Sequence, residues 1–174
     1  MQLTTGFRVR PLQATDREGL RAFFAGLSDQ ARYRRFHSPM AEAPPSYLRR
    51  LLDERRPTDV VEVAVDADGA IVGVAELLTS SAWSREPSWP AGVRATDLAF
   101  VVADDHRREG VARALVCAAL RDYGDAADIV RADVQPDNAA ALSLLRSVLP
   151  DGHAHVDSGT IVFEAVRHPD ALVA

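Results

Sequence analysis

The stretch that most restricts what this chain can fold into runs from Asp97 to Leu120. Its first residues, Asp97–Val102, are apolar on nearly both faces, which is typical of a central strand in a sheet. A short polar turn, residues 104–110, then leads into a segment, Val111–Tyr123, that is apolar almost all round and is expected to be a buried helix. A buried strand that feeds directly into a buried helix predicts a layered α/β fold.

The rest of the chain supplies strands and helices around this unit. Strands are predicted at residues 7–12, 60–66, 71–78, 129–134 and 153–166, the last divided by Asp157-Ser158-Gly159 into a hairpin, and helices at 15–27, 28–36, 46–53 and 136–146. Asp68-Gly69 predicts a hairpin turn, Thr15-Asp16-Arg17-Glu18 a capping box, and Ser28 an N-cap. No domain boundary is evident, so one domain spanning 1–174 is expected.

Charge and composition exclude some classes of function. The net charge of −5 argues against a nucleic-acid partner, because phosphate binding needs a basic surface. No apolar run approaches the roughly 20 residues of a membrane helix, and the N-terminus does not resemble a signal peptide. With Cys117 as the single cysteine, no internal disulfide can form. We expect a cytoplasmic protein without a membrane partner.

The turn before the predicted helix at Val111 is suited to an anion. A helix start carries about four unpaired N–H groups and the positive end of the helix dipole, which together favour a pyrophosphate. Gly110 is small enough to let phosphate approach, whereas Glu109 opposes binding unless it turns away. Ala112 is also small enough for phosphate to approach the backbone, and Arg107, Arg108 and Arg113 can add positive charge. An ordinary helix start is the alternative, and the P-loop and Rossmann fingerprints are absent.

The same turn resembles a motif of the GNAT superfamily of acyl-CoA N-acyltransferases. Arg107-Arg108-Glu109-Gly110-Val111-Ala112 fits that family's Gln/Arg-x-x-Gly-x-Gly/Ala pyrophosphate loop, and Leu98–Val102 looks like its fourth strand. Asp133–Asn138, followed by Ala141 and Leu145, looks like its second coenzyme motif. The resemblance covers residues 7–166. It implies a mixed, mostly antiparallel central sheet with splayed fourth and fifth strands and with helices on both faces.

The resemblance also implies the coenzyme and its site. Acetyl-CoA would be the acyl donor, and no metal would be needed. The backbone amides of the loop from Arg107 to Ala112, which includes Glu109 and Val111, would hold its pyrophosphate. Pantetheine would lie between the splayed strands, bonded to the backbone of Phe100-Val101-Val102, chiefly at Phe100 and Val102. Asn138 would contact the coenzyme near the pantetheine arm, with an ordinary N-cap as the alternative for this residue.

A closer resemblance is to Pat-type protein-lysine acetyltransferase domains. It rests on Leu20–Ser28, on Arg32–Phe36 and on Ala99–Asp105. It implies a protein lysine as the favoured amine acceptor, with a small amine next. A non-catalytic acetyl-CoA-binding module is the alternative from another class of function. Dimers are common in the resembled family, so a homodimer is one expected state.

Amine acetylation needs a base, because a lysine amine has a pKa of about 10.4 and is almost wholly protonated at pH 7. Pat-type domains carry a glutamate near the start of the fourth strand, and the matching residue here is Asp97. We expect Asp97 to be the base; the alternative is a structural aspartate that caps the strand end or bonds to the Trp83–Trp89 loop. Glu76 is the second candidate, with a solvent-facing strand residue as its alternative. Leu145 stands where many family members have a tyrosine acid.

Three other features are weaker candidates. His153 and His155 have no cysteine or carboxylate at a metal-binding spacing, so no metal site is expected. His106 beside the turn is expected to be an exposed loop residue. Trp83 and Trp89 would form a lid over the acceptor groove, or else anchor a long loop or a subunit contact.

Overall fold

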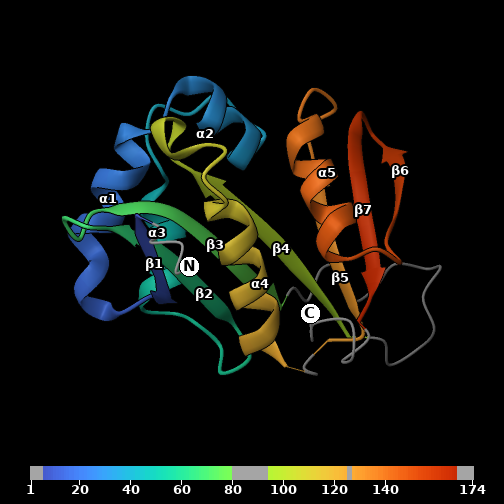
Figure 1. Ribbon diagram of the computed structural model, residues 1–174, viewed down its shortest axis with the longest axis horizontal. Helices are drawn as coiled ribbons and strands as arrows, with labels where there is room; N and C mark the ends of the chain where they lie inside the picture. Colours follow the sequence, from blue (N-terminus) through green and yellow to red (C-terminus); the bar gives the residue numbers. More distant parts are fainter. Residues whose placement is uncertain (1–5, 80–93, 125–126, 168–174) are drawn as a thin grey trace, which may run out of the picture.

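The computed structural model describes residues 6–79, 94–124 and 127–167. Its strands form one sheet in the order β1-β2-β3-β4-β5-β7-β6 (Figure 1). The strands are β1 (Phe7–Pro11), β2 (Val60–Asp66), β3 (Ile71–Thr79), β4 (Ala95–Val102), β5 (Ile129–Val134), β6 (His153–Asp157) and β7 (Thr160–Val166). Neighbouring strands are antiparallel except β4 and β5, which are parallel. The predicted mixed, mostly antiparallel sheet is confirmed. The Trp83–Trp89 segment lies outside the described residues.

Helices cover both faces of this sheet. They are α1 (Arg17–Gly26), α2 (Asp29–Phe36), α3 (Pro45–Leu52), α4 (Val111–Tyr123) and α5 (Ala139–Val148), with short 3₁₀ turns η1 (Ala14–Asp16) and η3 (Asp104–His106). One core, which includes Leu115 and Phe163, lies between the sheet and α4 with α5. A second core, which includes Phe24 and Leu51, lies between the sheet and α1 to α3. Within the described ranges, no helix combines the length and apolar character needed to cross a bilayer.

The start of α1 differs from the prediction. The capping box expected at Thr15–Glu18 is wrong, because Thr15 lies inside the turn η1 and the helix begins at Arg17. The carboxylate of Asp16 instead accepts a hydrogen bond from the backbone N–H of Gln13 at 2.8 Å. It also pairs with Arg10 at 2.6 Å. Because Asp16 pairs with this cation on β1 and accepts the N–H of Gln13, it belongs to the turn η1, and α1 begins at the next residue.

One buried carboxyl group lies on the face of β2 that α4 covers. Glu62 is 2% exposed, near Asp122 at the end of α4. Burial, together with the charge and hydrogen bond of Asp122, raises the pKa of Glu62 from 4.5 to about 7, and Arg121 lowers it only in part. The folded protein therefore holds a proton on Glu62 at pH values where the unfolded chain has lost it.

This proton makes stability depend on pH. Because the pKa of Glu62 is raised in the folded state, its proton contributes to folding stability. This contribution is fully present below pH 4.5 and is lost as the pH rises through about 7. Glu62→Gln keeps the shape and cannot ionise. At pH 8 we expect the free energy of unfolding of this variant to exceed that of the unchanged protein by on the order of 1–3 kcal/mol.

Urea denaturation at pH 5 and pH 8 measures this difference. Glu18→Gln is the matched control, because the Glu18 side chain is 81% exposed on α1 and should change neither value. An unchanged protein and a Glu62→Gln variant that lose the same stability between the two pH values would contradict the account.

Candidate functional site

The strands β4 and β5 run together only at their beginnings and then separate. The register pairs Ala95 with Ile129, Thr96 with Val130 and Asp97 with Arg131. Beyond Asp97, β4 stays paired with β3 and β5 stays paired with β7, but β4 and β5 have no further pairs with each other. Figure 1 shows the two strands diverging from this point. The predicted splay is confirmed, and it leaves one edge of β4 open.

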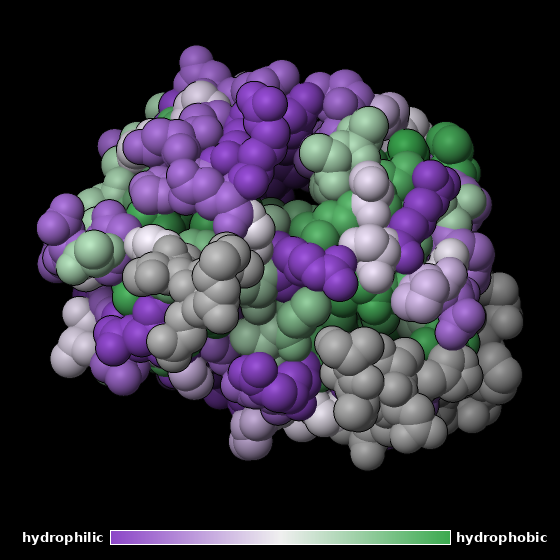
Figure 2. Space-filling view, in the orientation of Figure 1, coloured by the Kyte–Doolittle hydropathy of each residue, from purple (hydrophilic) through white to green (hydrophobic). Residues whose placement is uncertain are grey.

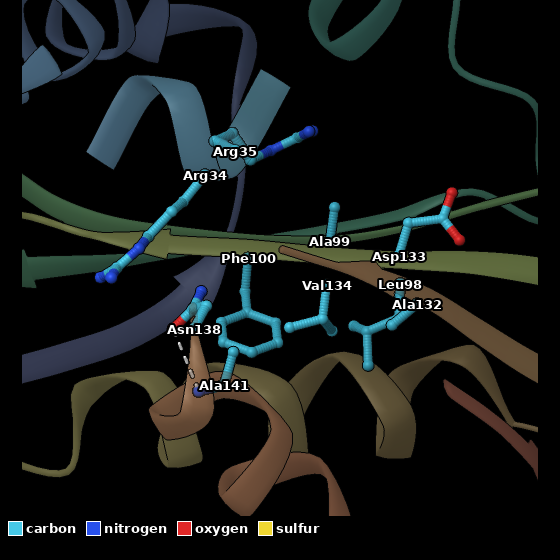
Figure 3. Close-up of a pocket in the computed structure, with 10 residues that line it drawn as sticks. All are labelled: Arg34, Arg35, Leu98, Ala99, Phe100, Ala132, Asp133, Val134, Asn138 and Ala141. Atoms are coloured by element: carbon cyan, nitrogen blue, oxygen red, sulfur yellow. Dashed lines mark hydrogen bonds between the residues drawn. The ribbon is translucent and has the colours of Figure 1, made fainter. Parts of the chain in front are cut away.

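A cleft occupies this gap (Figure 3). It holds about 360 Å³ of space, its open mouth included. Its walls come from β4, β5, α2 and the start of α5. The lining residues are Arg34, Arg35, Leu98, Ala99, Phe100, Ala132, Asp133, Val134, Asn138 and Ala141. Figure 2 shows the surface hollowed here, with hydrophilic residues along one side of the opening and hydrophobic residues along the other.

The start of α4 is open to an anion. Its N-cap, Gly110, has φ +85° and makes no side-chain cap. The first helical hydrogen bond runs from the N–H of Ala114 to the Gly110 carbonyl at 3.0 Å. The amides of residues 111–113 precede that bond, so they have no acceptor within the helix. By contrast, side chains cap α2 and α5, at Ser28 and Asn138.

The charged residues of the turn divide between free and paired groups. Glu109 turns toward His106, whose Nδ1 lies 3.1 Å from its carboxylate. This contact directs the Glu109 carboxylate toward His106. Arg108 is exposed and has a left-handed backbone, with φ +65°. Arg108 is therefore a guanidinium at the turn that a phosphate can reach.

Two arginines expected to add charge at the turn are held by other groups. Arg107 pairs with Asp104 at 2.5 Å, and Asp104 in turn accepts the backbone N–H of Ser28 at 3.2 Å. Arg113 donates to the hydroxyl of Ser147 on α5 at 3.0 Å. These contacts fix the turn against α2 and α4 against α5. A role for Arg107 and Arg113 toward a coenzyme stays a prediction.

Asn138 is the N-cap of α5, as the alternative for this residue anticipated. Its side-chain oxygen accepts the backbone N–H of Ala141 at 3.3 Å. In Figure 3 the amide nitrogen of the same side chain is turned away from the helix, toward the cleft. Capping thus fixes Asn138 in the cleft wall, and its contact with a coenzyme stays a prediction.

Asp97 lies where the two strands begin to separate. It is half-buried, and its register neighbours are Leu78 on β3 and Arg131 on β5. Register partners project from the same face of a sheet, so Asp97 lies beside the Arg131 side chain. Arg131 is 3% exposed and also lies 3.6 Å from the carboxylate of Glu164 on β7. A buried cation therefore stands next to Asp97 at the inner end of the gap.

Glu76 is buried, so the solvent-facing alternative for this residue is wrong. It is 3% exposed and forms an ion pair with Arg35 of α2. The hydroxyl of Tyr47 on α3 lies 3.2 Å from both carboxylate oxygens. Burial raises the pKa of Tyr47, and Arg35 lowers it in part. Arg35 balances the charge of Glu76, and together with Tyr47 it ties α2 and α3 to the sheet through this carboxylate. A catalytic role for Glu76 or for Asp97 stays a prediction.

No tyrosine stands at the usual acid position. Leu145 is fully buried in the core between α4, α5 and the sheet. Tyr123 is buried in the same core with its hydroxyl 3.0 Å from that of Thr79, and Tyr33 is 44% exposed on α2. None of the three tyrosines is among the residues that line the described cleft.

Sequence reasoning missed an ion pair between the two sides of the cleft. Arg34 of α2 donates to Asp137, in the turn before α5, at 2.8 Å. The run Arg32–Phe36 was noted only for its similarity to Pat-type domains. A cluster of arginines on one short helix was the available signal, but the sequence offered nothing to join it to Asp137.

The spacing of His153 and His155 in the sequence did not indicate a carboxylate beside them, and the structure places one there. Glu164 of β7 lies on the same face, and its carboxylate is 3.5 Å from Nε2 of His153. Glu164 was missed because it is separated from both histidines by the hairpin turn, and only the strand register brings them together.

Comparison with known proteins agrees with this geometry. The family model described as "Acetyltransferase (GNAT) family" matches residues 21–149. The GNAT domain of S. lividans PAT is 24% identical, with a TM-score of 0.74 over 92% of this chain and 90% of that one. A GNAT superfamily phosphinothricin acetyltransferase from Sinorhizobium meliloti, solved with AcCoA, is 12% identical, with a TM-score of 0.69 over 92% and 88%.

A ribosomal-protein-alanine N-acetyltransferase from Brucella melitensis is 17% identical, with a TM-score of 0.66 over 92% of this chain and 99% of that one. No curated protein matches the sequence. The structural neighbours establish the fold, and the match to the family model covers most of the chain.

Proposed function

Because the chain belongs to the acetyltransferase (GNAT) family, we propose that it transfers the acetyl group of acetyl-CoA to a primary amine, with a protein lysine as the favoured acceptor. The observation that carries this proposal is the open edge of β4. It joins the uncapped start of α4 at one end to Asp97 at the other. The proposal assigns the reaction to a single cytoplasmic domain spanning residues 1–174, and a homodimer stays a prediction.

The diphosphate of the coenzyme would bind at the start of α4. The amides of residues 111–113 have no acceptor within the helix, and the positive end of the helix dipole adds to their attraction for an anion. Arg108 supplies a full charge beside them. Gly110 keeps the approach clear, since no atom lies within 4 Å of the position that a Cβ would take.

The pantetheine arm would lie along the open edge of β4. Its amides can pair with an unpaired strand edge in the way an added strand does. Leu98 to Val102 offer such an edge, because β5 has already separated from them. The arm would run from the turn at Gly110 past Phe100, and the thioester would lie near Leu98 and Asp97.

Asp97 would then act as the base. Taking the proton from a lysine-type amine costs about 4–5 kcal/mol at pH 7, because its pKa is about 10.4. A carboxylate placed near the thioester can accept this proton directly or through one water, which typically gives about 10²–10⁴-fold in rate. Asp97 is one methylene shorter than a glutamate, so we favour a path through water.

The collapse of the tetrahedral intermediate would release the coenzyme as a thiolate. Backbone N–H groups along the open edge of β4 can stabilise the developing oxyanion. Leu145 has no proton to give, so the thiolate would leave without a side-chain acid and take its proton from water. Alkyl thiols such as that of cysteine have a pKa of about 8.5, far below that of water, so a thiolate can leave without prior protonation.

The acceptor would enter from the face of the sheet that carries α1 to α3. Asp97 and Asp133 project from that face, one on each side of the gap where β4 and β5 separate. Their carboxylates can attract a cationic amine, whereas Glu76 is buried and paired with Arg35. The similarity to Pat-type domains favours a lysine in a protein. A small amine is the second candidate, because the neighbour from Sinorhizobium meliloti bears the name of a phosphinothricin acetyltransferase.

An acceptor panel tests this function. The purified chain is incubated with acetyl-CoA and with lysine-containing proteins, polyamines or amino acids, and the release of free thiol is followed. The sequence contains no lysine, since every basic residue apart from histidine is arginine, so an anti-acetyl-lysine signal can come only from the added acceptor. We expect thiol release with protein lysines at least tenfold above that with free amines.

The other outcomes decide between the alternatives. Thiol release with small amines alone would replace the protein acceptor by the second candidate. Binding of acetyl-CoA without release on any acceptor would identify a non-catalytic acetyl-CoA-binding module. The Asp97→Asn variant serves as the background for all acceptors.

A further inference from the structure

Two histidines lie together on the outermost strand of the sheet, away from the residues that line the cleft. His153 and His155 are two residues apart on β6, so their side chains project from the same face. Their rings stack with centroids 6.2 Å apart and planes inclined by 21°. Both side chains are exposed, and that of His153 is 72% exposed. Figure 1 shows β6 as the edge strand beside β7.

A carboxylate from the next strand completes this group. Glu164 on β7 is the register partner of His153, and one of its oxygens, Oε2, lies 3.5 Å from Nε2 of His153. One ligand atom from each of His153, His155 and Glu164 lies within 4.8 Å of the others. Two imidazoles and one carboxylate thus converge on one point at the surface.

The carboxylate is itself held in place from below. The second oxygen of Glu164, Oε1, lies 3.6 Å from a guanidinium nitrogen of Arg131 on β5. Arg131 is 3% exposed and Glu164 is 9% exposed, so this contact is buried under the histidines. The ion pair fixes one oxygen inward and leaves the other facing the two imidazoles.

We propose that His153, His155 and Glu164 form a binding site for a divalent transition-metal ion such as Zn²⁺. Imidazole nitrogen and carboxylate oxygen are the ligands that zinc takes in proteins, and three of them leave a fourth position for water. With ligand bonds of about 2.0–2.2 Å, the ligand atoms of a tetrahedral zinc site lie about 3.3 Å from one another. Small rotations of the two exposed histidine side chains would bring the three ligand atoms to this spacing.

The buried arginine acts as the outer partner that orients a metal-bound carboxylate. The positive charge of Arg131 also repels a metal ion at this site, because Arg131 contacts the same Glu164 carboxylate that would bind the ion. We therefore expect preference among metals to follow ligand chemistry, with Zn²⁺ and Cu²⁺ bound more tightly than Mn²⁺ and with Mg²⁺ excluded by the two nitrogens. The proposal does not depend on acetyl transfer.

Calorimetric titration of the untagged, chelator-treated full chain with zinc chloride tests the site. We expect one zinc ion per chain. His155→Ala should weaken binding at least tenfold, and because the side chain is exposed on an edge strand the variant should fold as before. His106→Ala is the matched control, since His106 also pairs with a glutamate but has no second histidine beside it in the turn. Its zinc affinity should equal that of the unchanged chain.

Cobalt(II) gives a second reading on the same proteins. Bound by two histidines and a carboxylate, it should show the visible absorption of a four- or five-coordinate ion, and His153→Ala should remove that absorption. Absence of zinc binding in the unchanged chain would overturn the proposal. So would binding that both histidine variants keep unchanged.

Discussion

Replacing Gly110 with valine should abolish the binding of acetyl-CoA, with a loss in affinity of at least a hundredfold. Two effects act together. The valine side chain would stand in the open space before the amides of residues 111–113, where the diphosphate is proposed to lie. In addition, Gly110 has φ +85°, a backbone conformation that a β-branched residue avoids, so the turn itself would shift. Calorimetric titration with acetyl-CoA measures the result.

Gly69→Val controls for the general loss of stability that this backbone strain brings. Gly69 lies in the hairpin between β2 and β3, has φ +84°, and also has no atom within 4 Å of the position of a Cβ. It therefore suffers the same backbone strain away from the cleft. We expect this variant to lose stability and to keep its affinity for acetyl-CoA. Equal affinity in the unchanged and Gly110→Val proteins would show that the diphosphate binds elsewhere.

Asp97→Asn should lower the rate of acetyl transfer by at least tenfold, and by up to about 10⁴-fold if the carboxylate is the sole base. The amide keeps the shape of the side chain and cannot accept the proton of the amine. Because Asp97 lies at the inner end of the gap, beyond the proposed diphosphate site, the affinity for acetyl-CoA should change by less than about threefold. Steady-state kinetics and calorimetry on the same preparation measure both quantities.

Asp68→Asn is the matched control for this substitution. Asp68 is an exposed aspartate in the hairpin turn between β2 and β3, and it should leave both rate and affinity unchanged. An Asp97→Asn variant that keeps the full rate would remove Asp97 from the chemistry. An equal loss of rate and coenzyme affinity would instead make it a structural residue of the gap.

The local patterns of the sequence predicted the elements around the site well. The helix Val111–Tyr123 and the strand Ile129–Val134 begin and end where expected, because continuous apolar character and a following glycine act over a few residues. Ser28 caps α2 as predicted. The splay of β4 and β5 was expected only from the resemblance to a family, because no local sequence pattern indicates where two paired strands separate.

The errors share one physical cause. Glu76 is the one charged residue of β3 and was therefore open to interpretation as solvent-facing, but α2 and α3, far away in the sequence, cover that face and supply Arg35 and Tyr47. Likewise, the spacing of His153 and His155 lacks a carboxylate until the hairpin register places Glu164 beside them. Contacts set by tertiary packing and strand register cannot be read from residue spacing.

A crystal structure of the chain grown with saturating acetyl-CoA tests the central claim most directly. We expect diphosphate oxygens at hydrogen-bonding distance, about 2.7–3.2 Å, from the backbone nitrogens that begin α4. The pantetheine arm should run along Leu98–Val102, with the thioester next to Asp97. Coenzyme bound anywhere else, with the gap between β4 and β5 closed or empty, would contradict the account.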